Sequence, residues 1–219
     1  MFEDRKSAGD DLARQVIDLA LENPVVLALP RGGVPVAVPV ARGLNAPLDL
    51  ILVRKIGMPG NSELAAGAVV EGAEPVFNVA LLQSVGLDVG DFDDSLDRKR
   101  AEIAARRQMY LGARASVDLA GRCAVVVDDG IATGATVRAA LLGLRSRKVA
   151  RIILAVPVAP PDVVDEMRGL VDTVICLLSP KPFWSVGAHY RDFRQVGDGE
   201  VAALLAEADR SDTTKDVIT

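Results

Sequence analysis

The sequence is poor in aromatic residues, histidine and cysteine, and each shortage disfavours a class of function. Aromatic residues make up 4% of the 219 residues, and the single histidine is His189. A Ser/His or Cys/His nucleophilic site therefore has one candidate base and no obvious nucleophile beside it. No cluster of His, Cys, Asp and Glu has the spacing of a metal centre. Cys123 and Cys176 both fall in apolar runs, where buried, reduced thiols are expected, as suits the cytoplasm.

Long apolar runs and an excess of positive charge are also missing. No apolar stretch is long enough to span a bilayer, and the charged N-terminus, Met1 to Lys6, does not resemble a signal peptide. The net charge is -5 at pH 7, whereas a nucleic-acid surface needs clustered Lys and Arg. We therefore expect a cytoplasmic protein that binds neither nucleic acid nor membranes.

The hydrophobic content is sufficient for a sizeable core, since half of the residues are hydrophobic and a quarter are charged. We find no repeat and no linker, which predicts a single domain over residues 1–210. A polar tail at 211–219 is expected to be disordered.

Strand-like and helical patterns alternate along most of the chain. Apolar runs predict strands at 25–29, 48–53, 125–127, 151–156 and 171–178. Helices are predicted over 8–22, 36–42 and 162–170, from about 133, and from 198. This alternation predicts an α/β fold with a doubly wound, five-stranded parallel sheet, which binds ligands at the carboxyl edge of its strands. A hairpin at 66–79, a helical insertion at about 81–121 and a hood at about 179–196 interrupt the pattern.

The most informative stretch runs from Val125 to Thr136. Three β-branched residues predict a strand buried on both faces, and two adjacent acids, Asp128 and Asp129, follow at its carboxyl end. A Gly- and Thr-rich turn then leads into a helix, and the free N–H groups of such a turn bind phosphate. The two acids can accept hydrogen bonds from vicinal hydroxyls or hold a divalent cation. A phosphate beside a diol describes a ribose 5-phosphate.

Two further elements are expected at the same edge of the sheet. A Pro-Arg-Gly-Gly turn at 30–33 follows the first strand, and its glycines let the backbone approach a ligand while Arg31 adds a forked donor. The basic pair Arg54-Lys55 follows the second strand. An ordinary glycine turn and a solvated basic pair are the alternatives, but the agreement of three elements at one edge favours an anion site.

Residues 124–136 resemble the signature of type I phosphoribosyltransferases that binds 5-phosphoribosyl 1-pyrophosphate (PRPP). In that pattern a hydrophobic strand precedes two acids, two mostly aliphatic positions, and small and hydroxyl residues around a glycine. Gly130 departs from it, because the family more often has an aliphatic residue there. The resemblance implies the type I phosphoribosyltransferase fold and a role in nucleotide metabolism. It implies transfer of a 5-phosphoribosyl group from PRPP to a nucleobase or related nitrogen compound, with release of pyrophosphate.

The resemblance also implies a cofactor and an alternative function. Mg²⁺ would be carried by PRPP, with no direct ligand from the protein, and would reach Asp128 and Asp129 through water. A non-catalytic sensor or regulator that binds PRPP or a nucleotide on the same fold is the alternative. A homodimer is expected by analogy with the family alone.

Roles for individual residues follow from the same resemblance. Asp128, Asp129 and Lys55 would be catalytic, the acids holding the ribose hydroxyls and the lysine closing on the leaving pyrophosphate. The 5-phosphate would bind to Gly130, Ile131, Ala132, Thr133, Gly134, Ala135 and Thr136. The pyrophosphate would bind to Arg31, Gly32, Gly33, Arg54 and Lys55.

Two segments keep more than one interpretation. Residues 179–196 hold four of the eight aromatic residues, and the resemblance implies a hood over the acceptor formed by Phe183, Trp184, His189 and Tyr190. A hydrophobic cap or a dimer contact is the alternative. A helix from 94 to about 110 carries a face rich in Lys and Arg, which predicts a solvated surface, or else a contact with phosphates or a second subunit.

Overall fold

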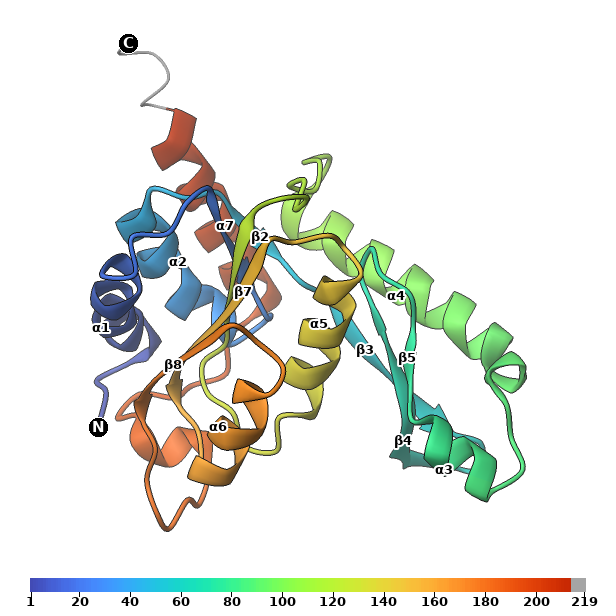
Figure 1. The fold of residues 1–219 in the computed structure, drawn as a ribbon. Helices are drawn as coiled ribbons and strands as arrows, with labels where there is room; N and C mark the ends of the chain where they lie inside the picture. Colours follow the sequence, from blue (N-terminus) through green and yellow to red (C-terminus); the bar gives the residue numbers. More distant parts are fainter. Residues whose placement is uncertain (214–219) are drawn as a thin grey trace.

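The computed structural model describes residues 1–213, apart from the side chains of 62, 63 and 211–213. Its centre is a five-stranded parallel sheet in the order β2-β1-β6-β7-β8 (Figure 1). The strands are β1 (Pro24–Ala28), β2 (Leu48–Leu50), β6 (Cys123–Val127), β7 (Arg151–Val158) and β8 (Thr173–Leu178). The predicted α/β fold, with a five-stranded parallel sheet, is confirmed.

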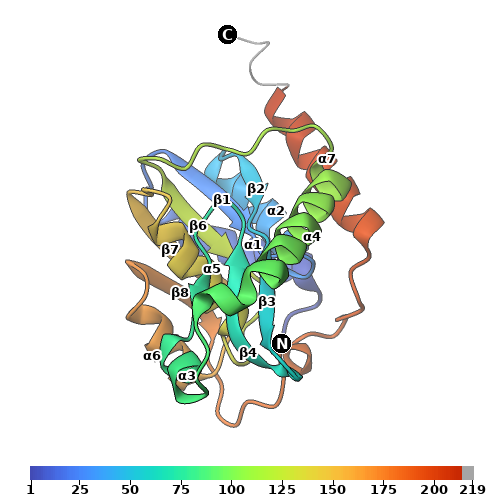
Figure 2. The same ribbon diagram turned by 90° about the vertical axis from the view of Figure 1, so that its right-hand side faces the viewer.

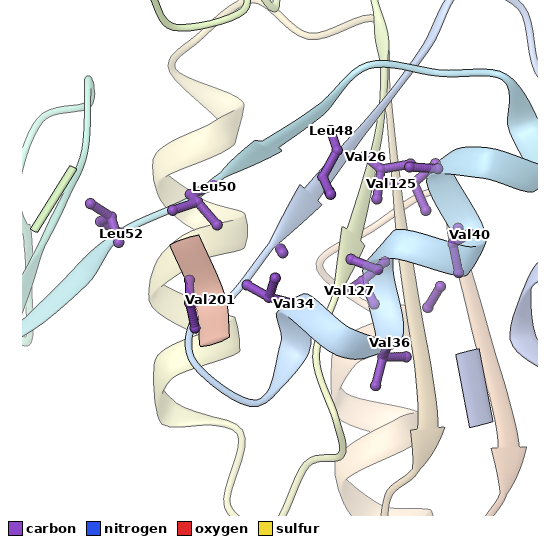
Figure 3. Close-up of a cluster of buried hydrophobic side chains, with 14 of the residues drawn as sticks. Val26, Val34, Val36, Val40, Leu48, Leu50, Leu52, Val125, Val127 and Val201 are labelled. Carbon is purple, nitrogen blue, oxygen red and sulfur yellow. The ribbon is translucent and has the colours of Figure 1, made fainter. Parts of the chain in front are cut away.

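Helices cover both faces of this sheet, as a doubly wound fold requires. Helices α1 (Arg5–Ile17), α2 (Gly33–Leu44) and α7 (Asp198–Thr213) lie on one face, and α5 (Ala135–Arg145) and α6 (Pro161–Arg168) lie on the other (Figure 1). Because side chains alternate along a strand, Val125 and Val127 pack toward α2 while Val126 packs toward α5. Figure 3 shows the hydrophobic core on the face covered by α2 and α7, where Val34 of α2 and Val201 of α7 approach the sheet.

Helix ends differ from the sequence prediction, most clearly in the first and last helices. The first helix begins at Arg5, where Asp4 and Ser7 form a reciprocal capping box, and ends at Ile17. The predicted continuation to residue 22 is wrong, because the chain turns through residues with positive φ at Ala20 and Asn23. Helix α7 continues to Thr213, so residues 211–213 of the predicted disordered tail are helical, and residues 214–219 lie outside the described part of the chain.

The predicted strand at 48–53 is in fact two strands in different sheets. The chain leaves the parallel sheet after β2, and β3 (Val53–Met58), β4 (Asn61–Val70) and β5 (Val76–Phe77) form a separate antiparallel sheet in that order. Ile51 and Leu52, between β2 and β3, are buried, so an unbroken apolar run conceals the bend. The predicted pairing of the strands near 68 and 77 is confirmed.

The helical insertion consists of α3 (Val79–Ser84), a short 3-10 turn (Val89–Phe92) and the long helix α4 (Asp93–Leu111). The prediction that the basic face of α4 is solvated is wrong for Arg107. This side chain is only 14% exposed and donates to both carboxylate oxygens of Asp49, at 3.0 and 3.1 Å, while it also pairs with Glu71 at 3.1 Å. The ion pairs fasten α4 to the edge strand β2, and the helix runs beside α7 (Figure 2).

Within residues 1–213, no helix combines the length and the apolar character needed to cross a bilayer.

Candidate functional site

Two turns meet at the carboxyl ends of the neighbouring strands β1 and β6. The Pro-Arg-Gly-Gly turn follows β1 and the acidic turn follows β6, and the two strands are paired up to Ala28 and Val127. A β-carbon placed on Gly32 would lie only 2.0 Å from Oδ2 of Asp129. Since real β-carbons do not approach other atoms so closely, the contact between the two turns requires glycine at this position. The predicted meeting of the turns at one sheet edge is confirmed.

The acidic turn leads directly into the N-terminus of α5. Gly134 is the N-cap residue, with a left-handed backbone at φ 77°, and no side chain caps the helix. The first N–H groups of α5 therefore point out of the helix without a capping partner, which is the arrangement that binds phosphate at helix N-termini. Ile131 is buried and its N–H donates to the carbonyl of Val158 at 2.9 Å. This anchor leaves the residues around it, Ala132, Thr133, Ala135 and Thr136, on the surface.

Gly130, which departs from the family pattern, has a packing reason. A β-carbon at this position would lie 2.5 Å from Cγ1 of Val186 and 2.9 Å from Cγ1 of Val158. Val186 belongs to the hood, so a larger residue would force the hood away from the acidic turn. Glycine, in place of the aliphatic residue that is usual in the family, therefore lets the hood pack closely against the acidic turn.

Asp129 has a partner that the sequence did not predict. Nε of Arg5 donates to Oδ2 of Asp129 at 2.7 Å, and both side chains are largely buried. The hydroxyl of Tyr190 donates to the backbone carbonyl of Asp129 at 2.6 Å. No local sequence pattern could have revealed Arg5, because 124 positions separate it from Asp129.

Both acids of the turn have a raised pKa. Burial, and then the adjacent Asp129 carboxylate, raise the pKa of Asp128 well above its ordinary value. Burial also raises the pKa of Asp129, and the hydrogen bond and charge of Arg5 oppose that rise. Burial and the negative charge of Asp129 raise the pKa of Tyr190, which keeps this phenol a hydrogen-bond donor. A bound cation, or hydroxyl groups that donate hydrogen bonds, would stabilise the ionised form of two such adjacent acids.

Arg31 lies beside the two turns but leans toward α7. Its guanidinium is 3.9 Å from Asp198, and this carboxylate also accepts a hydrogen bond from the hydroxyl of Tyr110 at 2.5 Å. That hydrogen bond lowers the pKa of Asp198. One third of the Arg31 side chain is exposed, so it remains within reach of a ligand on the turn.

The two residues of the basic pair, Arg54 and Lys55, lie on opposite faces of β3. Successive residues of a strand point to opposite faces, and Lys55 lines a cavity of about 570 Å³ together with Thr136 and Ala135 of α5. Arg54 points the other way, with Nε 3.5 Å from Glu102 of α4. The geometry thus brings Lys55 to the phosphate turn and directs Arg54 toward α4, so binding of pyrophosphate by Arg54 stays a prediction.

The hood is an irregular segment that packs on the N-terminus of the chain. Tyr190 is buried between the rings of Phe2 and Phe193, at centroid distances of 5.3 and 5.0 Å. It therefore supports the acidic turn and presents no open stacking face. Phe183 stacks on His189 at 5.5 Å, and Trp184 is 82% exposed. Of the four predicted acceptor residues, Trp184 has the most accessible ring.

A larger cavity, of about 800 Å³, lies at the C-terminal end of β4, and none of the predicted site residues lines it. Glu71 and Arg107 line it, and both take part in the ion pairs that fasten α4 to the sheet. We therefore place the functional site at the two turns rather than in this cavity.

Known proteins resemble this chain over most of its length. The family model of the phosphoribosyl transferase domain matches residues 2–192. Two curated proteins of Mycobacterium tuberculosis, from strains CDC 1551 and H37Rv, are named "Putative phosphoribosyl transferase" and are 43% identical to the chain over 210 residues. These matches cover 96% of the chain and 47% of each relative, so the chain spans about half the length of these relatives. Among solved structures, TT1426 from Thermus thermophilus is 43% identical, with a TM-score of 0.83 over 94% of this chain and 98% of that one.

Proposed function

The chain belongs to the phosphoribosyl transferase domain family, and from this premise we propose that it transfers a 5-phosphoribosyl group from PRPP to a nitrogen acceptor. The observation that carries the proposal is the contact between the Pro-Arg-Gly-Gly turn and the acidic turn, where only glycine fits at position 32. PRPP carries anions on both sides of a diol. Two anion-binding turns on either side of a carboxylate pair match that distribution of charge.

Each end of PRPP has a counterpart among the described residues. The 5-phosphate binds at the uncapped N-terminus of α5, where the hydroxyls of Thr133 and Thr136 add donors. The ribose hydroxyls donate to Asp128 and Asp129. The pyrophosphate lies against the turn at 31–33, with Lys55 approaching from the cavity that it shares with Thr136.

The proposed catalysis depends on charged side chains that stabilise the charges developing during the reaction. The bond between C1 of the ribose and the pyrophosphate oxygen breaks, and the electron pair leaves with pyrophosphate. A bond forms from C1 to the acceptor nitrogen, which gives up its proton to water. Positive charge develops on the ribose during this exchange, and the carboxylates of Asp128 and Asp129 stabilise it, while Arg31 and Lys55 stabilise the departing anion.

The donor set suits Mg²⁺ held mainly by the substrate. Mg²⁺ usually keeps several waters and binds one or two carboxylates together with substrate phosphates. Asp128 and Asp129 provide such carboxylates, and within residues 1–213 no group of three or more His, Cys, Asp and Glu could hold a metal on its own. When bound, Mg²⁺ would neutralise charge on the pyrophosphate, and the two acids would reach it through water.

The hood offers aromatic surface for the acceptor. The exposed ring of Trp184, with Phe183 and His189 stacked nearby, supports a flat acceptor such as a nucleobase. These three residues remain candidates for acceptor contacts.

A turnover assay tests the proposal. The protein is incubated with PRPP, Mg²⁺ and a panel of nucleobases and small amines, and the release of pyrophosphate is measured. We expect release with at least one acceptor and a loss of about two orders of magnitude or more in Asp128→Asn, because electrostatic stabilisation of the transition state is removed. PRPP binding without pyrophosphate release from any acceptor would instead identify a sensor, the alternative function.

A further inference from the structure

Asp129 is the one acid of the pair whose carboxylate is held by a distant part of the chain. Its Oδ2 accepts from Nε of Arg5 at 2.7 Å and lies against Gly32. Its other oxygen, Oδ1, accepts no hydrogen bond from another of the described residues. One oxygen is thus fixed by a distant side chain and the other is left for a ligand.

Arg5 is itself held in place by three groups at once. Besides the bond to Asp129, its Nη1 donates to the carbonyl of Arg194 at 2.8 Å, and its guanidinium carbon lies 3.8 Å from the centre of the Phe193 ring. Only 10% of the side chain is exposed. A planar guanidinium can donate in two directions while it stacks on a ring, and a lysine ammonium cannot reproduce this combination.

The residues before Arg5 are bonded to the hood. The N–H of Phe2 donates to the carbonyl of His189 at 2.8 Å, and the N–H of Arg191 donates to the carbonyl of Phe2 at 2.9 Å. The N–H of Asp192 likewise donates to the carbonyl of Glu3 at 2.9 Å. The N-terminal segment and the hood therefore form one unit, and Arg5 connects that unit to the acidic turn.

We propose that Arg5 is a positioning residue for the ribose: by holding Oδ2 of Asp129, it fixes the orientation in which Oδ1 receives a ribose hydroxyl. The inference rests on the proposed function, because it assumes that Asp129 binds the ribose of PRPP. Arg5 itself does not contact the substrate. The hydrogen bond and charge of Arg5 also oppose the burial that raises the pKa of Asp129, and so favour the ionised carboxylate, which accepts hydrogen bonds.

The test separates the two halves of the substrate. Ribose 5-phosphate and Mg²⁺-pyrophosphate are titrated separately, by calorimetry, into wild type, Arg5→Ala and Arg5→Lys. Removing a hydrogen bond to a charged group costs about tenfold in affinity. We expect Arg5→Ala to bind ribose 5-phosphate about tenfold more weakly and pyrophosphate as wild type does, with Arg5→Lys in between for ribose 5-phosphate.

Arg191→Ala is the matched control. It removes the exposed ion pair of Arg191 with Glu3, which joins the same two segments without touching Asp129, and should bind both ligands as wild type does. Unchanged binding of ribose 5-phosphate by Arg5→Ala overturns the inference, as does an equal loss of both ligands, which indicates a general structural role. If Arg5→Ala fails to fold, the same two outcomes are decided with Arg5→Lys. Wild type that binds neither PRPP nor ribose 5-phosphate contradicts the proposed function itself, and the inference falls with it.

Discussion

Replacing Gly32 by alanine is the sharpest perturbation that the structure offers. Gly32 has an ordinary right-handed backbone, with φ -60° and ψ -34°, so alanine meets no conformational penalty here. On conformational grounds alone, Gly→Ala would stabilise the fold by roughly 0.4–1 kcal/mol. Any destabilisation of Gly32→Ala must therefore come from the contact between the new methyl group and its surroundings.

The size of that contact follows from the distance. A β-carbon at position 32 lies 2.0 Å from Oδ2 of Asp129, so about 1 Å of movement is needed even to reach the shortest contacts that occur between atoms. Either Asp129 turns away and loses its bond to Arg5, or the turn retreats and loses the bond from the Gly33 N–H to the Leu29 carbonyl. Overpacking of this kind costs about 1–3 kcal/mol, which corresponds to a fall in Tm of about 2–12 °C for a chain of this length.

Thermal unfolding and turnover together measure the consequence. Because a misplacement of about 1 Å can cost about 100-fold in rate, Gly32→Ala should lose turnover more severely than its stability alone explains. Gly197→Ala is the control, since its β-carbon meets nothing within 4 Å, and it should match wild type in both assays. Wild-type Tm and wild-type turnover in Gly32→Ala would refute the contact between the two turns.

Three further predictions follow from the site. In Asp128→Asn, the buried charge is removed, so Tm at pH 7 should rise by about 3–5 °C for each pH unit by which burial and Asp129 raise the pKa of Asp128. Since a raised pKa means that stability is lost as pH rises, scans from pH 3 to 8 should show this gain vanishing below about pH 4, where both states of the wild type are protonated. Tyr190→Phe should lower the free energy of unfolding, measured in urea, by about 1–2 kcal/mol, because the Asp129 carbonyl loses its donor. Lys55→Ala should weaken calorimetric binding of Mg²⁺-pyrophosphate about tenfold.

Much of the fold and of the candidate site was predictable because it is written in local patterns. The three valines of β6 predict a buried strand, and the acids and glycines that follow them predict a turn and the start of a helix. Parallel topology then places the turns after β1 and β6 at one edge, where the structure finds them. These inferences need only short segments and the rule that ligands bind at the carboxyl ends of such strands.

The features that were not predictable depend on contacts between distant segments. The sequence gives no signal for the change of sheet at Ile51 and Leu52. Both residues are apolar and buried, so they continue the hydrophobic pattern of the strand before them. Arg107 lies on a basic helix face that the sequence predicts to be solvated, and only its ion pairs with Asp49 and Glu71 explain its low exposure. Arg5 likewise has no local pattern that separates it from a solvated charge. Its role follows from the tertiary contact with Asp129.

Calorimetric titration of PRPP in the presence of Mg²⁺ tests the central claim most directly, since that claim is a single PRPP site built from the two turns. Wild type should bind with a Kd on the order of 1 μM, equivalent to about -8 kcal/mol. Asp128→Asn, which keeps the shape of the side chain and removes its charge, should bind at least about 100-fold more weakly while its Tm stays at or above that of wild type. No binding to wild type, or equal affinity in Asp128→Asn, would contradict the account.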